Sequence, residues 1–124
     1  MIKPEEIRKG LLIRLETEGG FILETIKGEY EDDEFMVTTN YGTRKLSDFS
    51  PILITPQWLI DYGFNEVNPL YYKDNHFHVA FADSKIYFGM FEHHIREIKY
   101  VHDLQNIYYA ITQKELALND HTNQ

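Results

Sequence analysis

The sequence contains no cysteine. This absence excludes a disulfide framework, a thiolate nucleophile and a zinc site built on cysteine sulfur. Long apolar runs are also missing, because none approaches the roughly 20 residues that a membrane-spanning helix needs. The N-terminus lacks the apolar stretch of a signal peptide. The sequence therefore predicts a cytoplasmic protein that has no membrane partner.

Positive charge is scarce, because 12 Lys and Arg residues stand against 20 Asp and Glu residues and give a formal net charge of -8. The deficit is spread along the chain, with seven basic against eleven acidic residues in positions 1–50 and five against nine in positions 51–124. Affinity for nucleic acid comes mainly from basic side chains that neutralise phosphates. A nucleic-acid partner is therefore disfavoured, although a local basic patch would still allow one.

Sequence motifs of the common enzyme classes are absent. The chain has no Gly-x-Ser-x-Gly elbow, no phosphate-binding glycine loop and no His-Glu-x-x-His helix. Its three serines fall at turn positions that explain them without catalysis. The sequence therefore favours a non-enzymatic role, and it predicts no catalytic residue and no cofactor.

Short β-strands dominate the first fifty residues. Leu11–Glu16 and Phe21–Ile26 flank the pair Gly19-Gly20, which offers the left-handed positions of a tight hairpin. Two further short strands are expected at Phe35–Thr39 and Thr43–Leu46. Four or five short strands in so short a segment predict a small SH3-like β-barrel for residues 1–51.

A second part, residues 52–124, is expected to follow the turn-forming segment LSDFSP. Thr55 and Pro56 are typical of a helix start, and Gly63 of a helix end. Three strands are then expected, at positions 70–73, 77–81 and 85–92. With a final helix this gives an α-β-β-β-α part, so the sequence predicts an α+β protein whose two parts pack into one compact unit.

The final helix is predicted over Ile98–Leu116, because apolar side chains recur there at three- and four-residue steps. We expect this helix to cover one face of the three-stranded sheet. The expected contacts join Leu104, Tyr108 and Ile111 of the helix to Phe77, Val79 and Phe81 of the sheet. Three polar residues, Asp103, Gln105 and Asn106, are expected to face solvent.

Six histidines are the one unusual reactive feature. His76 and His78 stand two apart on a predicted strand, so both point to one side, a spacing that metal sites use. Further ligands would have to come from nearby positions, with Asp83, Glu92, His93 and His94 available. The favoured interpretation is a partly exposed sheet face that holds no metal. A metal-dependent hydrolase using His76 and His78 remains an alternative, and His102 is expected at the surface or the boundary of the helix.

Aromatic residues make up 15% of the chain, a high share for its length. Four of them are candidates for interaction, namely Tyr71, Tyr72, Tyr87 and Phe91. On an open sheet face they would form a platform for stacking on nucleic-acid bases, but acidic neighbours cancel the few nearby cations. They suit a protein interface equally well, because such interfaces are enriched in aromatic residues. The leading interpretation is a protein-interaction or self-association module, with nucleic-acid binding through the barrel or the tyrosine face as an alternative.

Two segments also resemble a known family. They are ILITPQWLIDYGF at Ile52–Phe64 and, after a tyrosine-rich stretch, IKYVHDLQNIYYAITQKEL at Ile98–Leu116. Both are similar to segments of a family of small proteins without assigned activity from Bacteroidetes genomes and their phages and mobile elements. Ile7–Ile13 matches the N-terminal segment of that family loosely, with Leu11 where asparagine is usual. The resemblance implies a bacterial or phage-borne origin and no mechanism.

Overall fold

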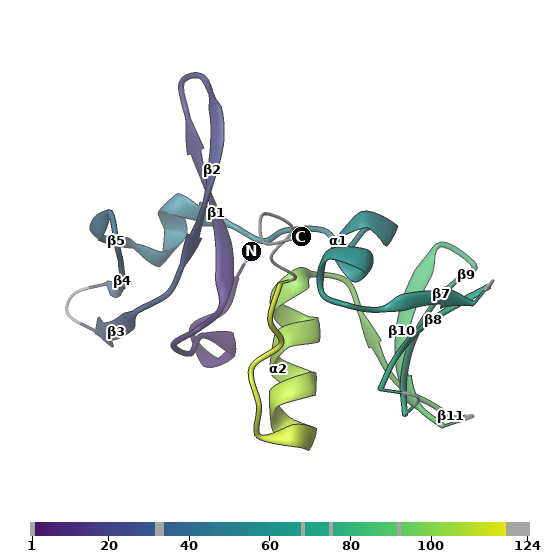
Figure 1. The fold of residues 1–124 in the computed structure, drawn as a ribbon. Coiled ribbons are helices and arrows are strands. Elements are labelled where there is room, and N and C mark those ends of the chain that lie inside the picture. The colour runs from purple at the N-terminus through teal and green to yellow at the C-terminus, as the bar shows by residue number, and fades with distance from the viewer. Residues whose placement is uncertain (1, 32–33, 68, 75, 92, 119–124) are drawn as a thin grey trace.

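The computed structural model describes residues 2–31, 34–67, 69–74, 76–91 and 93–118. Strands account for 48% of the structure and helices for 21%, so the chain is mainly β and the predicted α+β class is wrong. The strands form three open antiparallel sheets, of three, three and five strands. Figure 1 shows the two smaller sheets on one side of the longest helix and the largest sheet on the other. No helix in these described ranges is long and apolar enough to cross a membrane.

The N-terminal part begins with a 3-10 turn, η1 (Pro4–Glu6), and the predicted hairpin follows it. Strands β1 (Leu12–Thr17) and β2 (Gly20–Thr25) pair in antiparallel register. The hairpin is confirmed, but the predicted pair of left-handed glycines is not: Thr17 pairs with Gly20, so Glu18 and Gly19 form the turn, and of the two glycines only Gly20 has a positive φ, of 140°. The hairpin projects from the body of the molecule (Figure 1).

A second sheet follows, made of β3 (Gly28–Glu31), β4 (Phe35–Thr39) and β5 (Gly42–Lys45). After a second 3-10 turn, η2 (Leu46–Asp48), the short strand β6 (Phe49–Ser50) pairs with the free edge of β1. Among the described residues no strand pairing joins the two sheets, so the predicted SH3-like barrel is wrong. The strands do not close into a barrel, because β6 forms one edge of the β2-β1-β6 sheet and β2, at the other edge, pairs with no further described strand.

The C-terminal part begins with α1 (Pro56–Asp61), which has the predicted start and end. Thr55 Oγ1 accepts a hydrogen bond from the backbone N of Trp58 at 3.4 Å, and Gly63 takes a φ of 90°. Phe64 then turns back into the core beside α1, where Trp58 packs against the same cluster. These local predictions are confirmed.

The meander that follows has five strands instead of the predicted three. The expected strands are β8 (Leu70–Lys73), β9 (Phe77–Ala82) and β10 (Lys85–Met90). The additional strands are β7 (Asn65–Val67) and β11 (His93–Ile98), one at each edge of the sheet. All three side chains of β7 and five of the six in β11 are exposed, so neither strand shows the alternation of a half-buried strand.

The final helix, α2 (Val101–Thr112), is shorter than predicted, because Ile98 belongs to β11, Tyr100 is an extended N-cap residue and Gln113 ends the helix with a φ of 61°. Leu104 and Tyr108 share a core cluster with Phe77 and Val79, as expected, and the rings of Phe77 and Tyr108 lie 5.5 Å apart. Ile111 and Phe81 are 39% and 37% exposed. The contact between helix and sheet is therefore confirmed in its centre and narrower than predicted.

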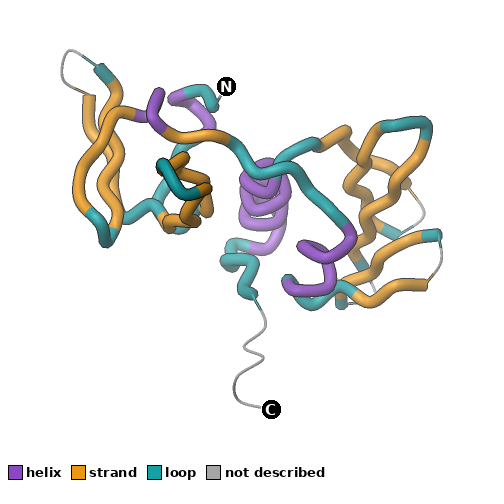
Figure 2. The backbone as a smooth tube through the Cα atoms, turned by 90° about the horizontal axis from the view of Figure 1, so that it is seen from above, coloured by secondary structure: helices purple, strands orange, loops and turns teal. Residues whose placement is uncertain are grey.

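Helix α2 lies between the two β-rich parts, as the end-on view in Figure 2 shows. Its second face is polar but covered, since Gln105 is only 3% exposed. Gln105 Oε1 accepts from Leu12 N at 2.9 Å, and its Nε2 donates to the Gly10 carbonyl at 3.2 Å. Asn106 Nδ2 donates to the Glu6 carbonyl at 2.9 Å. The prediction that Gln105 and Asn106 face solvent is wrong, because the segment before β1 covers this face.

Two apolar clusters make up the core. One is built on the two N-terminal sheets and includes Ile13, Val37 and Phe49. The other lies between α1, α2 and the five-stranded sheet, and Leu12 of β1 joins it. The division of the chain at residue 51 stays a prediction, but Leu12 and the hydrogen bonds of Gln105 link the two parts.

Replacing Gln105 with methionine is expected to cost about 1 to 3 kcal/mol of the free energy of unfolding. Methionine keeps the volume and the helix, but it leaves the N–H of Leu12 buried without an acceptor. Urea denaturation followed by circular dichroism measures the loss. Gln57→Met is the control, because Gln57 is exposed on α1 and should change stability by less than about 0.5 kcal/mol. Equal effects of the two variants would show that the buried bonds do not matter.

Candidate functional site

The two histidines predicted as a possible metal pair, His76 and His78, differ in burial and in the rings they contact. His78 is 2% exposed, and its Nε2 lies 3.1 Å from Nδ1 of His94. His76 is exposed, and its ring is tilted against that of Phe91 with centroids 5.6 Å apart. The expectation of a partly exposed face holds for His76 but is wrong for His78, because the rings of Tyr72 and His94 pack against it.

The His78–His94 pair joins a buried ring to an exposed ring on the edge strand β11. Burial lowers the pKa of His78, the nearby His94 lowers it further, and the Phe91 backbone opposes both. No third His, Asp or Glu ligand converges on this pair among the residues that the structure describes. Glu92, one of the ligands considered from the sequence, lies outside those residues.

The four aromatic candidates do not form one platform. Tyr71 is buried in the core, and its hydroxyl lies 3.5 Å from Glu66. Tyr72 and Tyr87 lie beside the rings of His78 and His94. Phe91 is exposed at the end of β10, next to His76. A stacking surface that uses all four residues is therefore not present.

A hollow of about 510 Å³ lies beside the projecting hairpin. We call it the hairpin groove. Its wall combines one face of the hairpin, the segment after β6, the first turn of α1 and the residues before α2. The lining residues are Arg14, Phe21, Leu23, Ser50, Pro51, Ile52, Leu53, Thr55, Trp58, Lys99 and Tyr100. The size falls within the range of about 300 to 1,000 Å³ that is typical of ligand sites.

Strand alternation explains which hairpin residues face the groove. Phe21 and Leu23 lie two apart on β2 and therefore point to the same side, and Arg14 is the register partner of Leu23 on β1. The opposite side of β1 carries Ile13 and Leu15, which fill the N-terminal core. The groove face of the hairpin consequently stays open, and Phe21 is 55% exposed.

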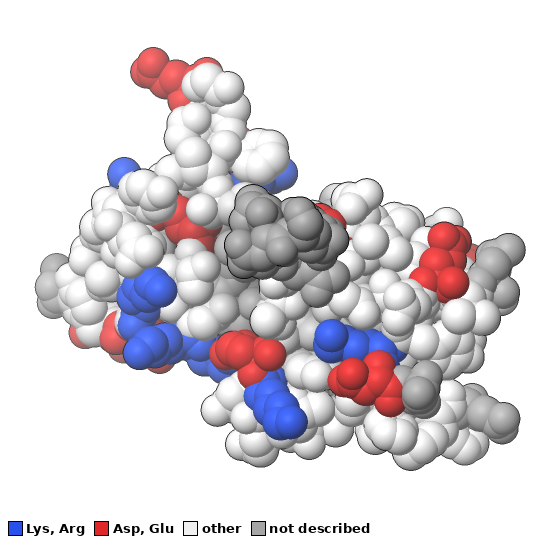
Figure 3. Space-filling model, viewed as in Figure 1, with Lys and Arg blue, Asp and Glu red and all other residues white. Residues whose placement is uncertain are grey.

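The charge of the groove is opposite to that of the chain. Its lining includes Arg14 and Lys99 and no Asp or Glu, although the whole chain carries -8. The Arg14 guanidinium lies 5.1 Å from the Phe21 ring centroid and 2.9 Å from Glu16, while its Nε has no hydrogen-bond partner. Figure 3 shows the hairpin as largely uncharged surface with acidic atoms at its tip. The groove thus offers cations and apolar side chains together.

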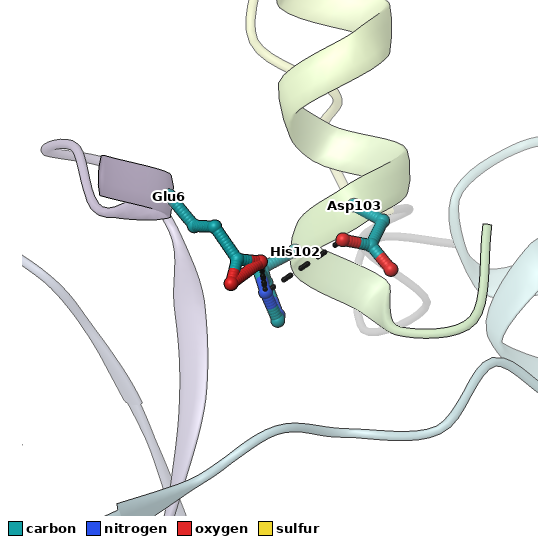
Figure 4. Close-up of side chains that lie close together, drawn as sticks. All are labelled: Glu6, His102 and Asp103. Atoms are coloured by element: carbon teal, nitrogen blue, oxygen red, sulfur yellow. Dashed lines mark hydrogen bonds and ion pairs between the residues drawn. The ribbon is translucent and has the colours of Figure 1, made fainter. Parts of the chain in front are cut away.

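A second group of side chains converges where η1 meets α2 (Figure 4). His102 is 1% exposed, which corrects the expected surface position. Its Nε2 lies 2.9 Å from Glu6 Oε2 and 3.7 Å from Asp103 Oδ1. The pKa of Glu6 lies below its usual value: burial, the largest single influence, opposes this shift, and hydrogen bonds from His102 and the Lys3 backbone outweigh it.

Comparisons with known proteins provide no assignment. No family model matches the chain, and neither the curated proteins nor the solved structures contain a significant match. The resemblance to small Bacteroidetes and phage proteins therefore stays a prediction. Any functional conclusion must come from the geometry of the chain itself.

Both convergent sites escaped the sequence analysis because their members are far apart in the chain. Arg14 and Lys99 line one groove from β1 and from the residue that follows β11. Glu6 and His102 are 96 positions apart. The adjacent pair His102-Asp103 was the only local sign of the second group. It was not recognised, because only the apolar face of the helix was expected to be buried.

Proposed function

We propose that this protein is a non-enzymatic, cytoplasmic interaction module that binds an extended acidic segment of a protein partner in the hairpin groove. The observation that supports this proposal is the edge strand β2, whose exposed Phe21 and Leu23 line a groove that also contains Arg14 and Lys99. An exposed strand edge accepts another strand by backbone hydrogen bonding. The side chains beside it then determine which segment is accepted.

The chemistry of the groove specifies the partner. Arg14 and Lys99 favour Asp or Glu, because a carboxylate pairs with either cation. Phe21, Leu23 and Trp58 favour a large apolar side chain next to the acid. A second copy of this chain is a poorer occupant, because two chains of charge -8 repel each other.

A random-peptide library displayed on yeast is the appropriate probe, followed by fluorescence polarisation with an enriched synthetic peptide. We expect enriched peptides to place Asp or Glu near an aromatic or aliphatic residue. Each of Arg14→Gln, Phe21→Ser and Lys99→Gln should weaken binding at least about tenfold, the effect of losing about 1.4 kcal/mol at an interface anchor.

Tyr41→Ser is the matched control, because Tyr41 is exposed between β4 and β5, away from the groove. Its affinity should equal that of the unchanged protein. The proposal is wrong if the groove variants bind as well as the control, or if no acidic peptide is enriched. It is also wrong if light scattering shows a dimer that Phe21→Ser dissociates, or if a single-stranded oligonucleotide binds in the groove in preference to peptides.

A further inference from the structure

We propose that Glu6, His102 and Asp103 form a binding site for one divalent transition-metal ion of the zinc class. This site is separate from the hairpin groove and does not depend on the function proposed above. It joins the start of the chain to the start of α2. Among the described residues, these three are the one group of His, Asp and Glu whose ligand atoms all lie within 4.8 Å of one another.

The separations fit a metal ion. Zinc takes histidine nitrogen at about 2.0 to 2.1 Å and carboxylate oxygen at about 2.0 to 2.2 Å, so adjacent ligands of a tetrahedral site lie roughly 3.4 Å apart. The distances from His102 Nε2 to Glu6 Oε2 and Asp103 Oδ1 are 2.9 and 3.7 Å, one on each side of this value. Small side-chain shifts would equalise the separations around an ion.

Backbone N–H groups hold both carboxylates in place. Glu6 Oε1 accepts from Lys3 N at 3.0 Å. Asp103 Oδ2 accepts from Lys99 N at 3.1 Å and from Tyr100 N at 2.9 Å. The oxygen that remains on each carboxylate is the one closest to His102 Nε2. Such hydrogen bonds orient metal ligands before the ion arrives, which lowers the cost of binding.

The fourth coordination position is accessible. Glu6 and Asp103 both line a hollow of about 440 Å³, and each side chain is 27% exposed. A water molecule from this hollow would complete the tetrahedron. Arg8 also lines it but is engaged with Glu115, Asn106 and the Gln105 carbonyl, so it does not occupy the site.

His102 Nδ1 sets a limit on the affinity. It is buried and has no hydrogen-bond partner. When Nε2 binds a metal, Nδ1 carries the ring proton and would remain an unsatisfied donor, whereas most metal-binding histidines donate this proton to an acceptor. We therefore expect an affinity in the micromolar range, weaker than that of structural zinc sites.

Titration of the full chain, purified without a histidine tag, tests the site. Isothermal calorimetry with Zn²⁺ should show one ion per chain, and Co²⁺ should develop the visible absorption of a tetrahedral complex. Glu6→Gln and Asp103→Asn should each weaken binding at least about tenfold, since even loss of an orienting partner has that effect. Both variants retain an oxygen that accepts the backbone hydrogen bonds, so the fold should persist.

Two control variants exclude other sites. Glu5→Gln alters a neighbouring carboxylate in the same hollow, and His94→Gln breaks the close pair of His78 and His94. Both should bind Zn²⁺ as the unchanged protein does. The proposal fails if the unchanged protein binds no ion at millimolar Zn²⁺, if both ligand variants bind normally, or if only His94→Gln loses the ion. If either Glu6→Gln or Asp103→Asn does not fold, the Zn²⁺ affinity of the variant that does fold tests the proposal.

Discussion

Replacing Leu104 with alanine should lower the free energy of unfolding by about 2 to 5 kcal/mol. Leu104 is fully buried in the first turn of α2 and belongs to the cluster that includes Phe77, Val79 and Phe88. Alanine removes apolar contact and leaves a cavity between the helix and the five-stranded sheet. Urea denaturation monitored by tryptophan fluorescence measures the change, since Trp58 packs against the same cluster.

Ile111→Ala is the matched control for this change. Ile111 lies on the same helix and belongs to the apolar pattern that predicted the helix, but its side chain is 39% exposed. Its loss should be below about 1 kcal/mol, because partly exposed side chains leave no closed cavity. A cost of less than about 1 kcal/mol for Leu104→Ala would mean that α2 does not cover the sheet.

Replacing Gly89 with alanine should cost about 1 to 3 kcal/mol or more. A Cβ at this position would come within 3.0 Å of His78 Nε2 and of the His93 backbone oxygen, closer than real Cβ atoms approach. The His93 oxygen belongs to β11, which pairs with β10 at this point through an irregular register. It can move only if the pairing changes, so the strain cannot be relieved by a side-chain rotation. Thermal unfolding measures the effect.

Gly28→Ala provides the comparison. Gly28 begins β3, and an added Cβ there meets no atom within 4 Å. The variant should be neutral or slightly stabilising, because alanine reduces the freedom of the unfolded chain. If the two glycine variants melt at the same temperature, the close approach of His78 and β11 to Gly89 does not exist in solution.

The sequence predicted correctly those helices and turns whose conformation is set by residues close together in the chain. The β1–β2 hairpin follows from Gly19-Gly20, and α1 follows from Thr55-Pro56 and Gly63. In each case the conformation is determined by residues that lie within one turn of the chain. The sequence was therefore sufficient without knowledge of distant contacts.

Distant contacts explain what was missed. The barrel prediction failed because counting strands does not say which edges pair, and β6 takes the edge of β1. The buried state of Gln105 and His102 was missed because a hydrophobic pattern finds only the apolar face of a helix. Here the polar face is covered as well. Both candidate sites depend on such contacts, so no local motif marks them.

The position of α2 between the two parts has a consequence during synthesis. On the ribosome the N-terminal segments emerge first, and the N-terminal core contains no residue of α2. That core is able to assemble while the N–H of Leu12 and the carbonyl of Gly10 still bind water. Only when α2 has left the exit tunnel can Gln105 replace that water. A nascent chain that stalls before residue 101 would therefore expose an unfinished C-terminal half to chaperones and proteases.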